Sequence, residues 1–225
     1  MLKETIEKVL QEISRGNNFG EKITLVAAIK MQSAETVNAA IASGVEVVAE
    51  NKVQEFREKT AFLSPCRQHF IGHLQTNKVK YIVGKAELIH SVDSVKLAEA
   101  INDFAAKHAI IQDILIEINA GGEETKSGFS PESAAAAVKE ITANFKNLRV
   151  KGLMAMLPES DNAEYLGGLF DKMRALYDNL KSEGYPFTCL SMGMSGDYKI
   201  AIAHGSNMIR LGTALFGKRN YGGTD

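Results

Sequence analysis

The residues best suited to chemistry in this sequence lie at the ends of apolar segments of strand length. Lys30 follows the apolar run at 25–29, and Arg210 follows a short run near the end of the chain. Any strand must run out into polar residues, so each such position also has an ordinary structural reading. Together they predict one site if the fold gathers the strand ends. The full set consists of Lys30, Glu50, Asn51, His73, Ser91, Asp93, Asn119, Met154, Met156, residues 191–195, Arg210, Gly212 and Thr213.

Lys30 is the strongest candidate nucleophile. The segment before it is apolar throughout, which predicts a strand that is buried on both faces. A lysine at the mouth of such a structure is partly desolvated, and desolvation lowers the pKa of an amine. The neutral amine is the form that attacks an aldehyde. The alternative is a solvated lysine that simply leaves a strand.

Two loops rich in small residues could hold a phosphate. The first, LSMGMSGD at 190–197, places Ser195 beside Met194 just before a predicted helix, where free N–H groups and the helix dipole attract anions. The second, RLGTALFG at 210–217, offers Gly212 and Thr213. Ordinary tight turns use the same residue types. A lysine and a phosphate cradle on one rim nevertheless favour pyridoxal 5′-phosphate, an aldehyde that carries a phosphate.

Strand-length apolar runs alternate with helical patterns along the whole chain. Ser33 is a candidate N-cap, Pro131 opens a helix, and Gly44 and Gly184 end helices. The predicted strands are 23–28, 45–49, 69–72, 87–90, 111–118, 150–156, 188–191 and 207–211. The predicted helices are an opening helix over 1–10, then 33–43, 52–63, 77–83, 95–108, one from Pro131, 164–183 and 198–204.

This order predicts about eight β-α units and therefore a parallel sheet, because parallel neighbours need crossover connections. We expect one domain over residues 1–225, a single (β/α)8 TIM barrel with an extra N-terminal helix. All strand ends then share one rim, and the loops after strands seven and eight are a common phosphate site. An open doubly wound sheet is the alternative, but no Gly-x-Gly-x-x-Gly motif follows the first strand.

Composition narrows the function classes. Lys and Arg total 26 against 27 Asp and Glu, which argues against a nucleic-acid binder that works through basic charge. Two distant cysteines, Cys66 and Cys189, do not make a disulfide framework and fit a reducing compartment. No segment has the pattern of a signal peptide or a membrane span. We therefore expect a soluble cytoplasmic protein.

Several long motifs resemble those of the pyridoxal-phosphate-binding homeostasis protein family. HFIGHLQTNK at 69–78 matches the family's HFIGHLQ-x-NK, and GEETKSG at 122–128 resembles its GEE-x-K-x-G loop. GLM at 152–154 and the two small-residue loops at 190–197 and 210–217 match as well. The resemblance covers nearly the whole chain and implies a (β/α)8 barrel similar to the N-terminal domain of alanine racemase.

The resemblance also implies roles for individual residues. Lys30 would form a Schiff base with pyridoxal 5′-phosphate. Ser195, with Met194 beside it, would hold the phosphate together with Gly212 and Thr213. The remaining implied contacts are Arg210 at the pyridine nitrogen and Asn51 and His73 along the pocket wall.

Four positions depart from the family pattern. Ile29 and Met31 flank Lys30 where the family usually has Ser and Thr, and Ala49 and Gln68 replace a usual Gly and Trp. Strand alternation should turn Ile29 away from the side that Lys30 occupies. We therefore expect cofactor binding to survive, with altered polarity next to Lys30.

Carrier and catalyst are the two competing function classes. A permanently cationic arginine at the pyridine nitrogen leaves that nitrogen unprotonated, which weakens the ring as an electron sink. Neither His73 nor Tyr198 stands out as a second base, and we do not expect the additional domain that racemases use. We favour a monomeric carrier that binds pyridoxal 5′-phosphate and related B6 vitamers and supplies apo-enzymes. The alternative is an amino-acid racemase or decarboxylase.

A third class is a phosphosugar or indole-phosphate barrel enzyme in which Lys30 is a general acid. Metal sites are not expected, because the His69 and His73 pair lacks the His-Glu-x-x-His pattern. The methionines at 154, 156, 192 and 194 are interpreted as barrel packing, and Asp93, Glu123 and Glu124 as solvated loop charges.

Overall fold

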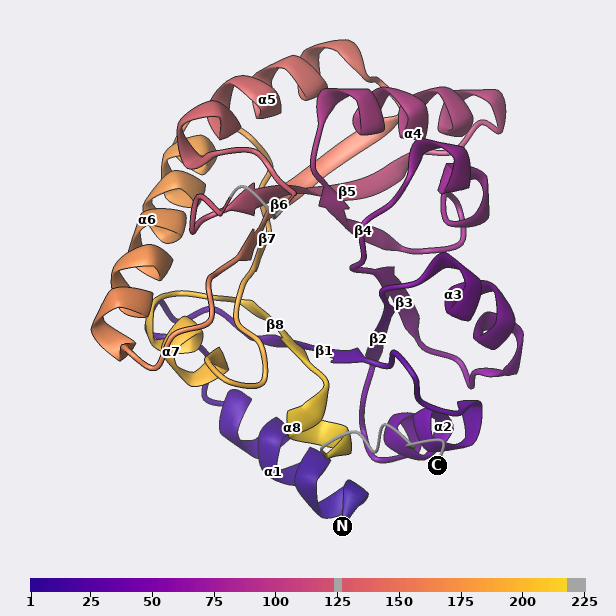
Figure 1. The fold of residues 1–225 in the computed structure, drawn as a ribbon, viewed down its shortest axis with the longest axis vertical. Helices are drawn as coiled ribbons and strands as arrows, with labels where there is room; N and C mark the ends of the chain where they lie inside the picture. Colours follow the sequence, from indigo (N-terminus) through magenta and orange to yellow (C-terminus); the bar gives the residue numbers. More distant parts are fainter. Residues whose placement is uncertain (124–126, 218–225) are drawn as a thin grey trace, which may run out of the picture.

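Each strand of the central sheet pairs in parallel with the next strand along the chain, and the last pairs with the first (Figure 1). The computed structural model describes residues 1–123 and 127–217, and within them eight strands close into a barrel. The predicted TIM barrel is therefore confirmed. The strands are β1 (Thr24–Ala28), β2 (Val47–Glu50), β3 (Arg67–Phe70), β4 (Leu88–Val92), β5 (Gln112–Asn119), β6 (Leu148–Met156), β7 (Cys189–Ser191) and β8 (Met208–Leu211).

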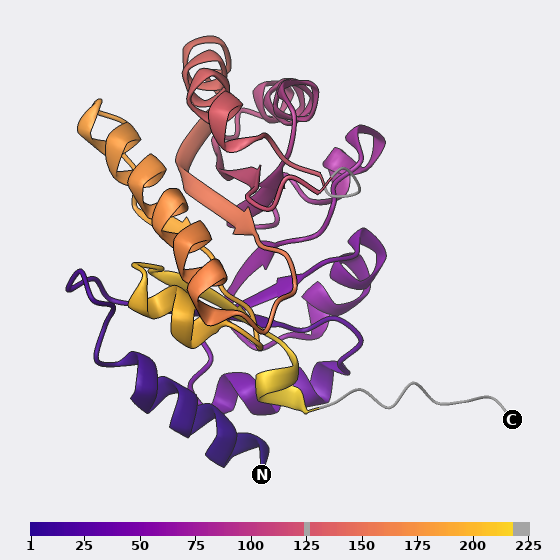
Figure 2. The same cartoon turned by 60° about the vertical axis from the view of Figure 1, so that its left-hand side comes forward.

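Helices surround the barrel (Figure 1). The extra N-terminal helix is present as α1, which packs against α2 and α8 outside the barrel (Figure 2). The α-helices are α1 (Leu2–Ile13), α2 (Ala34–Ala42), α3 (Val53–Lys59), α4 (Val95–Lys107), α5 (Pro131–Asn144), α6 (Ala163–Ser182), α7 (Tyr198–Ala203) and α8 (Thr213–Phe216). Two 3₁₀ helices are η1 (Thr60–Phe62) and η2 (Thr76–Tyr81).

Local signals at the helix ends act as the sequence indicates. The Ser33 hydroxyl accepts a hydrogen bond from the Thr36 N–H at 3.2 Å at the start of α2. Pro131 occupies the first turn of α5, where its missing N–H costs nothing. Gly44 and Gly184 follow α2 and α6 with φ of +104° and +97°, a conformation that favours glycine.

Several elements differ from the prediction. The helix expected over 52–63 is α3 followed by the 3₁₀ helix η1. The helix expected over 77–83 is the 3₁₀ helix η2, and a short α8 follows β8 where none was expected. Strand β3 begins at Arg67 rather than at residue 69, because the Arg67 N–H bonds to the Glu46 carbonyl and residues 67–70 pair with β2. Pairing with a neighbour sets this boundary, and exposed polar residues give no apolar pattern to predict it from.

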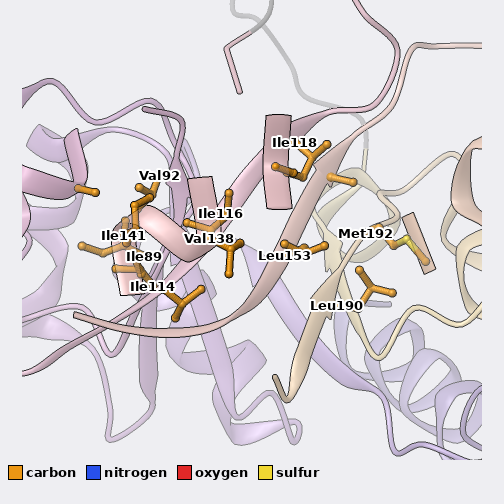
Figure 3. Close-up of a cluster of buried hydrophobic side chains, with 14 of the residues drawn as sticks. Ile89, Val92, Ile114, Ile116, Ile118, Val138, Ile141, Leu153, Leu190 and Met192 are labelled. Carbon is orange, nitrogen blue, oxygen red and sulfur yellow. The ribbon is translucent and has the colours of Figure 1, made fainter. Parts of the chain in front are cut away.

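The strands divide their side chains between two cores. Outward-facing residues such as Ile114, Ile116 and Leu153 pack beneath the helices, where Val138 and Ile141 of α5 meet them (Figure 3). Inward-facing residues fill the barrel, namely Val26, Val47, Ala49, Leu88, Leu115, Met154 and Met208. This alternation decides which side chain at each strand end faces the barrel mouth.

Across residues 1–123 and 127–217, no helix combines the length and the apolar character needed to cross a bilayer.

Candidate functional site

A cavity of 620 Å³ opens at the carboxyl ends of the strands, within the range of small-molecule sites. Seven of the eight predicted cofactor residues line it: Lys30, Asn51, Met194, Ser195, Arg210, Gly212 and Thr213. The structure thus brings together residues that are up to 183 positions apart in sequence, between Lys30 and Thr213. Closure of the barrel produces this proximity, because it places β1 beside β8.

Lys30 is half-buried and lies two residues beyond the end of β1. The Gln32 N–H donates to the Ile29 carbonyl at 3.1 Å, so residues 29–32 form a turn with Lys30 at its second position. Ile29 is 1% exposed and packs outside the barrel with residues such as Val37 and Val48. The two side chains therefore point to opposite sides, as strand alternation predicts.

Ser195 sits where two backbone N–H groups converge. Its hydroxyl oxygen accepts from the Gly212 N–H at 3.2 Å and from the Ala214 N–H at 3.1 Å. Convergent backbone N–H groups form a concave surface that binds anionic oxygens. The loop before Ser195 is fixed by the Met194 N–H, which donates to Asp197 Oδ1 at 2.6 Å. This corner of the cavity can therefore receive a phosphate.

Arg210 is fixed beneath the cavity. Its Nη1 donates at 2.8 Å both to the Ser191 carbonyl and to Ser191 Oγ, and its Nη2 donates to the Ala155 carbonyl at 3.1 Å. Burial lowers the pKa of Arg210 to about 10, with Asp197 and Glu117 opposing that shift. The guanidinium is still protonated at neutral pH and acts as an immobile hydrogen-bond donor.

Two buried histidines continue from Arg210 into the barrel. Ser191 Oγ lies 3.2 Å from His90 Nδ1, and His90 Nε2 lies 3.0 Å from His69 Nδ1. Both rings are fully buried, and His69 Nε2 has no hydrogen-bond partner among the residues that the structure describes. This series of hydrogen bonds was not predicted from the sequence. The available signal was a histidine within each of two predicted strands, His69 and His90.

Asn51 and His73 have different surroundings. Asn51 lines the cavity, and its Oδ1 is buried without a hydrogen-bond partner in the described part of the chain. Such an atom is available to a ligand donor. His73 is not among the described residues that line the cavity; its side chain is 61% exposed and pairs with Asp93 at 3.0 Å. The role of His73 as a pocket residue therefore stays a prediction; its charge acts on Glu117 at the barrel mouth.

Glu117 is a buried acid on the β5 side of the barrel mouth. Its side chain follows the inward-facing Leu115 by two positions, and the residue is 8% exposed. Burial and the negative charge of Asp93 raise the pKa of Glu117 to about 7, while Arg210 and His73 act in the opposite direction. The sequence analysis did not single out this residue.

The loop after β6 forms the cavity wall that sequence reasoning missed. Its residues 157–161 line the cavity together with Leu166 of α6. A polar loop directly after a strand was the only signal. Met156 lines the cavity as well, whereas Met154 and Met192 are packing residues, as predicted for that group. In the loop at 122–128, residues 124–126, including the predicted solvated charge of Glu124, lie outside the described residues.

Tyr198 and the His69–His73 pair, which were considered as a base and as metal ligands and not favoured, do not meet at this site. The Tyr198 hydroxyl bonds to Glu12 on α1 at 3.1 Å, outside the barrel. His69 is buried while His73 is exposed, so the two do not share a face. No cluster of three His, Cys, Asp or Glu side chains suited to a metal ion occurs within residues 1–123 and 127–217.

Comparison with known proteins identifies close relatives. The sequence model of the family described as alanine racemase, N-terminal domain, matches residues 10–220. A pyridoxal phosphate homeostasis protein of Aquifex aeolicus is 43% identical over 97% of this chain and 95% of its own. A protein of the same name from Haemophilus influenzae is 34% identical over 98% of this chain and 94% of its own.

Solved structures with a similar fold belong to the same kinds of protein. PipY of Synechococcus elongatus, solved with PLP bound, matches with a TM-score of 0.85 and 28% identity over 96% of this chain and all of its own. Alanine racemase of Clostridium difficile matches with a TM-score of 0.80 over 97% of this chain and 59% of its own. At 16% identity, the second likeness supports the fold alone.

Proposed function

Because the chain belongs to the alanine racemase N-terminal domain family and, within it, to the pyridoxal phosphate homeostasis proteins, we propose that it binds pyridoxal 5′-phosphate (PLP) through Lys30 and holds it in reserve for other proteins. The observation that carries the proposal is that Lys30 and the Ser195 corner line one cavity of 620 Å³. An amine and an anion site in one cavity match a ligand with an aldehyde and a phosphate.

Different residues of the cavity bind different parts of PLP in this proposal. When bound, PLP supplies an aldehyde that condenses with the Lys30 amine to a Schiff base, with loss of one water. The Ser195 hydroxyl receives the phosphate: its oxygen accepts from the N–H groups of Gly212 and Ala214, and its hydrogen is left to donate to a phosphate oxygen. Arg210 presents a fixed cationic donor to the ring, and the buried Asn51 Oδ1 accepts a ligand hydrogen bond.

A carrier role fits the cavity better than catalysis does. The described residues that line it include no His, Cys or Tyr; its acidic residues are Asp197, which accepts from the Met194 N–H, and Glu159 and Asp161 in the loop after β6. An arginine at the ring nitrogen does not supply a proton to it, so stabilisation of a carbanion is weak. Release to apo forms of PLP-dependent enzymes, binding of related B6 vitamers and a monomeric state are parts of the same proposal.

The test compares the parent protein with Lys30→Ala after incubation with PLP. We expect a visible absorbance band in the parent alone, and borohydride should fix the mass of reduced PLP on the peptide that contains Lys30. Loss of the band without loss of the folded state ties it to this amine. An equal band in Lys30→Ala, or a reduced adduct on another lysine, would contradict the proposal.

The carrier and the enzyme are separated by a second experiment. The loaded protein is mixed with the apo form of a PLP-dependent enzyme, and recovery of that enzyme's activity is followed against an equal amount of free PLP. A carrier restores activity and does not racemise free amino acids. Rapid racemisation or decarboxylation without transfer would favour the enzyme. Phosphate-dependent binding without a reducible adduct would favour a phosphosugar or indole-phosphate enzyme.

A further inference from the structure

The turn that carries Lys30 contains a backbone conformation that is unfavourable for its residue. Met31 has φ of +61°, in the left-handed region that residues other than glycine rarely adopt. The residue is 54% exposed, so packing of its side chain does not hold the conformation in place. Residues in such conformations persist when neighbouring groups determine them, and such residues cluster at functional sites.

Two residues of α3 bond to the backbone on either side of Lys30. The Met31 N–H donates to Glu55 Oε2 at 2.7 Å, and Lys59 Nζ donates to the Ile29 carbonyl at 2.9 Å. Glu55 and Lys59 are one helical turn apart and bond to each other at 2.9 Å. The peptide groups before and after Lys30 are therefore held by one ion pair from outside the cavity.

This ion pair is itself anchored away from water. Lys59 Nζ also contacts Glu50 Oε1 at 2.5 Å, and the side chain of Glu50 is 2% exposed. The exposed fractions of the side chains of Lys59 and Glu55 are 14% and 19%. Glu50 lies on β2 beside the inward-facing Ala49, so its own side chain points outward toward α3. Hydrogen bonds to charged groups are strong in such shielded positions.

We infer that Glu55 and Lys59 are positioning residues for Lys30. They keep the turn in its left-handed form, and this form directs the Lys30 amine into the cavity. Neither of them lines the cavity, so they act through the backbone of Ile29 and Met31. The inference rests on the proposed function, in which Lys30 is the residue that bonds to PLP.

The test measures PLP binding in Glu55→Ala, Glu55→Gln and a control on the same helix, Glu58→Ala. Glu58 bonds only with Gln54 on the exposed face of α3 among the described residues. We expect the apparent affinity for PLP and the yield of the borohydride-reduced adduct at limiting PLP to fall about tenfold in Glu55→Ala, the effect of losing one hydrogen bond to a charged group. The amide of Glu55→Gln still accepts from the Met31 N–H but lacks the charge that pairs with Lys59, so its affinity should fall between those of the parent and Glu55→Ala, whereas Glu58→Ala should stay within about twofold of the parent.

A rescue separates positioning from a general loss of stability. Glycine adopts the left-handed region readily, so adding Met31→Gly to Glu55→Ala should restore the adduct yield. A purely structural role would lower the thermal midpoint of the unloaded protein without rescue by glycine. Should Glu55→Ala fail to fold, Met31→Val disturbs the same turn from an exposed position, because a β-branched residue strongly disfavours positive φ. It should then show the same loss.

The outcomes distinguish the inference from the function on which it rests. If the parent forms no reducible adduct on Lys30, the proposed function fails and the inference falls with it. If the parent forms the adduct and Glu55→Ala forms it equally well, the inference alone is overturned. Failure of Met31→Gly to restore the yield in Glu55→Ala also overturns it.

Discussion

Arg210 Nη1 lies 2.8 Å from Ser191 Oγ, and this one contact sets the direction of a buried hydrogen-bond chain. A guanidinium has donors only, so Ser191 Oγ accepts from Arg210. The acceptor that remains for the serine hydroxyl in the described structure is His90 Nδ1, and His90 Nε2–H then donates to His69 Nδ1. The cationic residue at the cavity floor thus fixes the tautomers of two neutral histidines below it.

Ser191→Ala should destabilise the protein, because it leaves His90 Nδ1 without a partner inside the barrel. A buried polar group without a hydrogen bond costs about 1–3 kcal/mol of unfolding free energy. Urea unfolding at neutral pH measures the difference. Ser182→Ala, at the exposed end of α6, is the control and should change stability by less than about 0.5 kcal/mol. Equal stability of the two variants would contradict the buried chain.

The neutral state of the two histidines predicts an acid-dependent loss of stability. Burial, reinforced by the Arg67 cation, lowers the pKa of His69 to about 4, and burial together with His69 and Arg210 lowers that of His90 well below its ordinary value. In the unfolded chain both rings take up protons near pH 6.5. Because the unfolded state binds more protons, the free energy of unfolding falls as the pH drops from about 6.5 toward 4.

His69→Gln should reduce by one the number of protons that the chain takes up on unfolding, and so should make the free energy of unfolding less dependent on pH. Each neutral histidine contributes at most about 1.4 kcal/mol per pH unit to the slope. Urea unfolding in steps between pH 6.5 and 4.5 measures that slope in the parent and the variant. His108→Gln, which replaces an exposed histidine at the end of α4, is the matched control. A slope that is unchanged by His69→Gln would show that His69 is protonated in the folded state.

The residues at the rim of the barrel could be predicted from the sequence because they depend only on the alternation of strand and helix patterns along the chain. Alternating strands and helices imply the barrel, and the barrel gathers the residues after each strand, so Lys30 and Ser195 follow from their positions. The inward direction of His90 could not be predicted. Strand β4 shifts register between Ile89 and Val92, so a count from either end gives a different face.

The contacts of Glu55 and Lys59 with the backbone beside Lys30, and the exposure of His73, could not be predicted from the sequence for a related reason. Glu55 and Lys59 have the spacing of an ordinary surface ion pair on a helix, and only the tertiary structure places them against the backbone of Ile29 and Met31. His73 follows β3 at the expected rim position, but its side chain is 61% exposed and pairs with Asp93. Neither the contacts of Glu55 and Lys59 nor the exposure of His73 can be read from residue type or spacing.

Gly72→Ala should disturb the cavity through Asn51. A Cβ at Gly72 would overlap the Asn51 carbonyl oxygen, and backbone cannot move aside as a side chain can. We expect a loss of about 1–3 kcal/mol in unfolding free energy and weaker PLP binding, because Asn51 lines the cavity. Gly168→Ala in α6, where a Cβ meets nothing, is the control. A Gly72→Ala variant with parental stability and PLP affinity would contradict the close approach.

Ser195→Ala should weaken the response to the phosphate of the ligand. The variant loses the hydroxyl that occupies the point where the Gly212 and Ala214 N–H groups converge. We expect the affinity for PLP to fall about tenfold, the effect of one hydrogen bond to a charged group. Pyridoxal without the phosphate is the internal control and should bind the variant and the parent equally. Parallel losses for both ligands would place the effect of Ser195 elsewhere than on the phosphate.

Glu117→Gln should raise stability in alkaline solution and leave it unchanged in acid. The pKa of Glu117 is raised to about 7 in the folded protein, chiefly by burial and next by Asp93, whereas the unfolded carboxyl titrates near 4.5. The fold therefore favours the protonated acid. The stability that this preference contributes is complete below about pH 4.5 and is lost as the pH rises through about 7.

The neutral amide of the variant does not titrate, so the variant avoids that loss. We expect its free energy of unfolding to exceed that of the parent by up to about 3 kcal/mol at pH 8 and to equal it at pH 4.5. Urea unfolding at the two pH values measures both differences, with the exposed Glu99→Gln on α4 as the control. A gain of the same size at both pH values would mean that the amide packs or bonds better than the acid, and that the buried charge of Glu117 is not the cause.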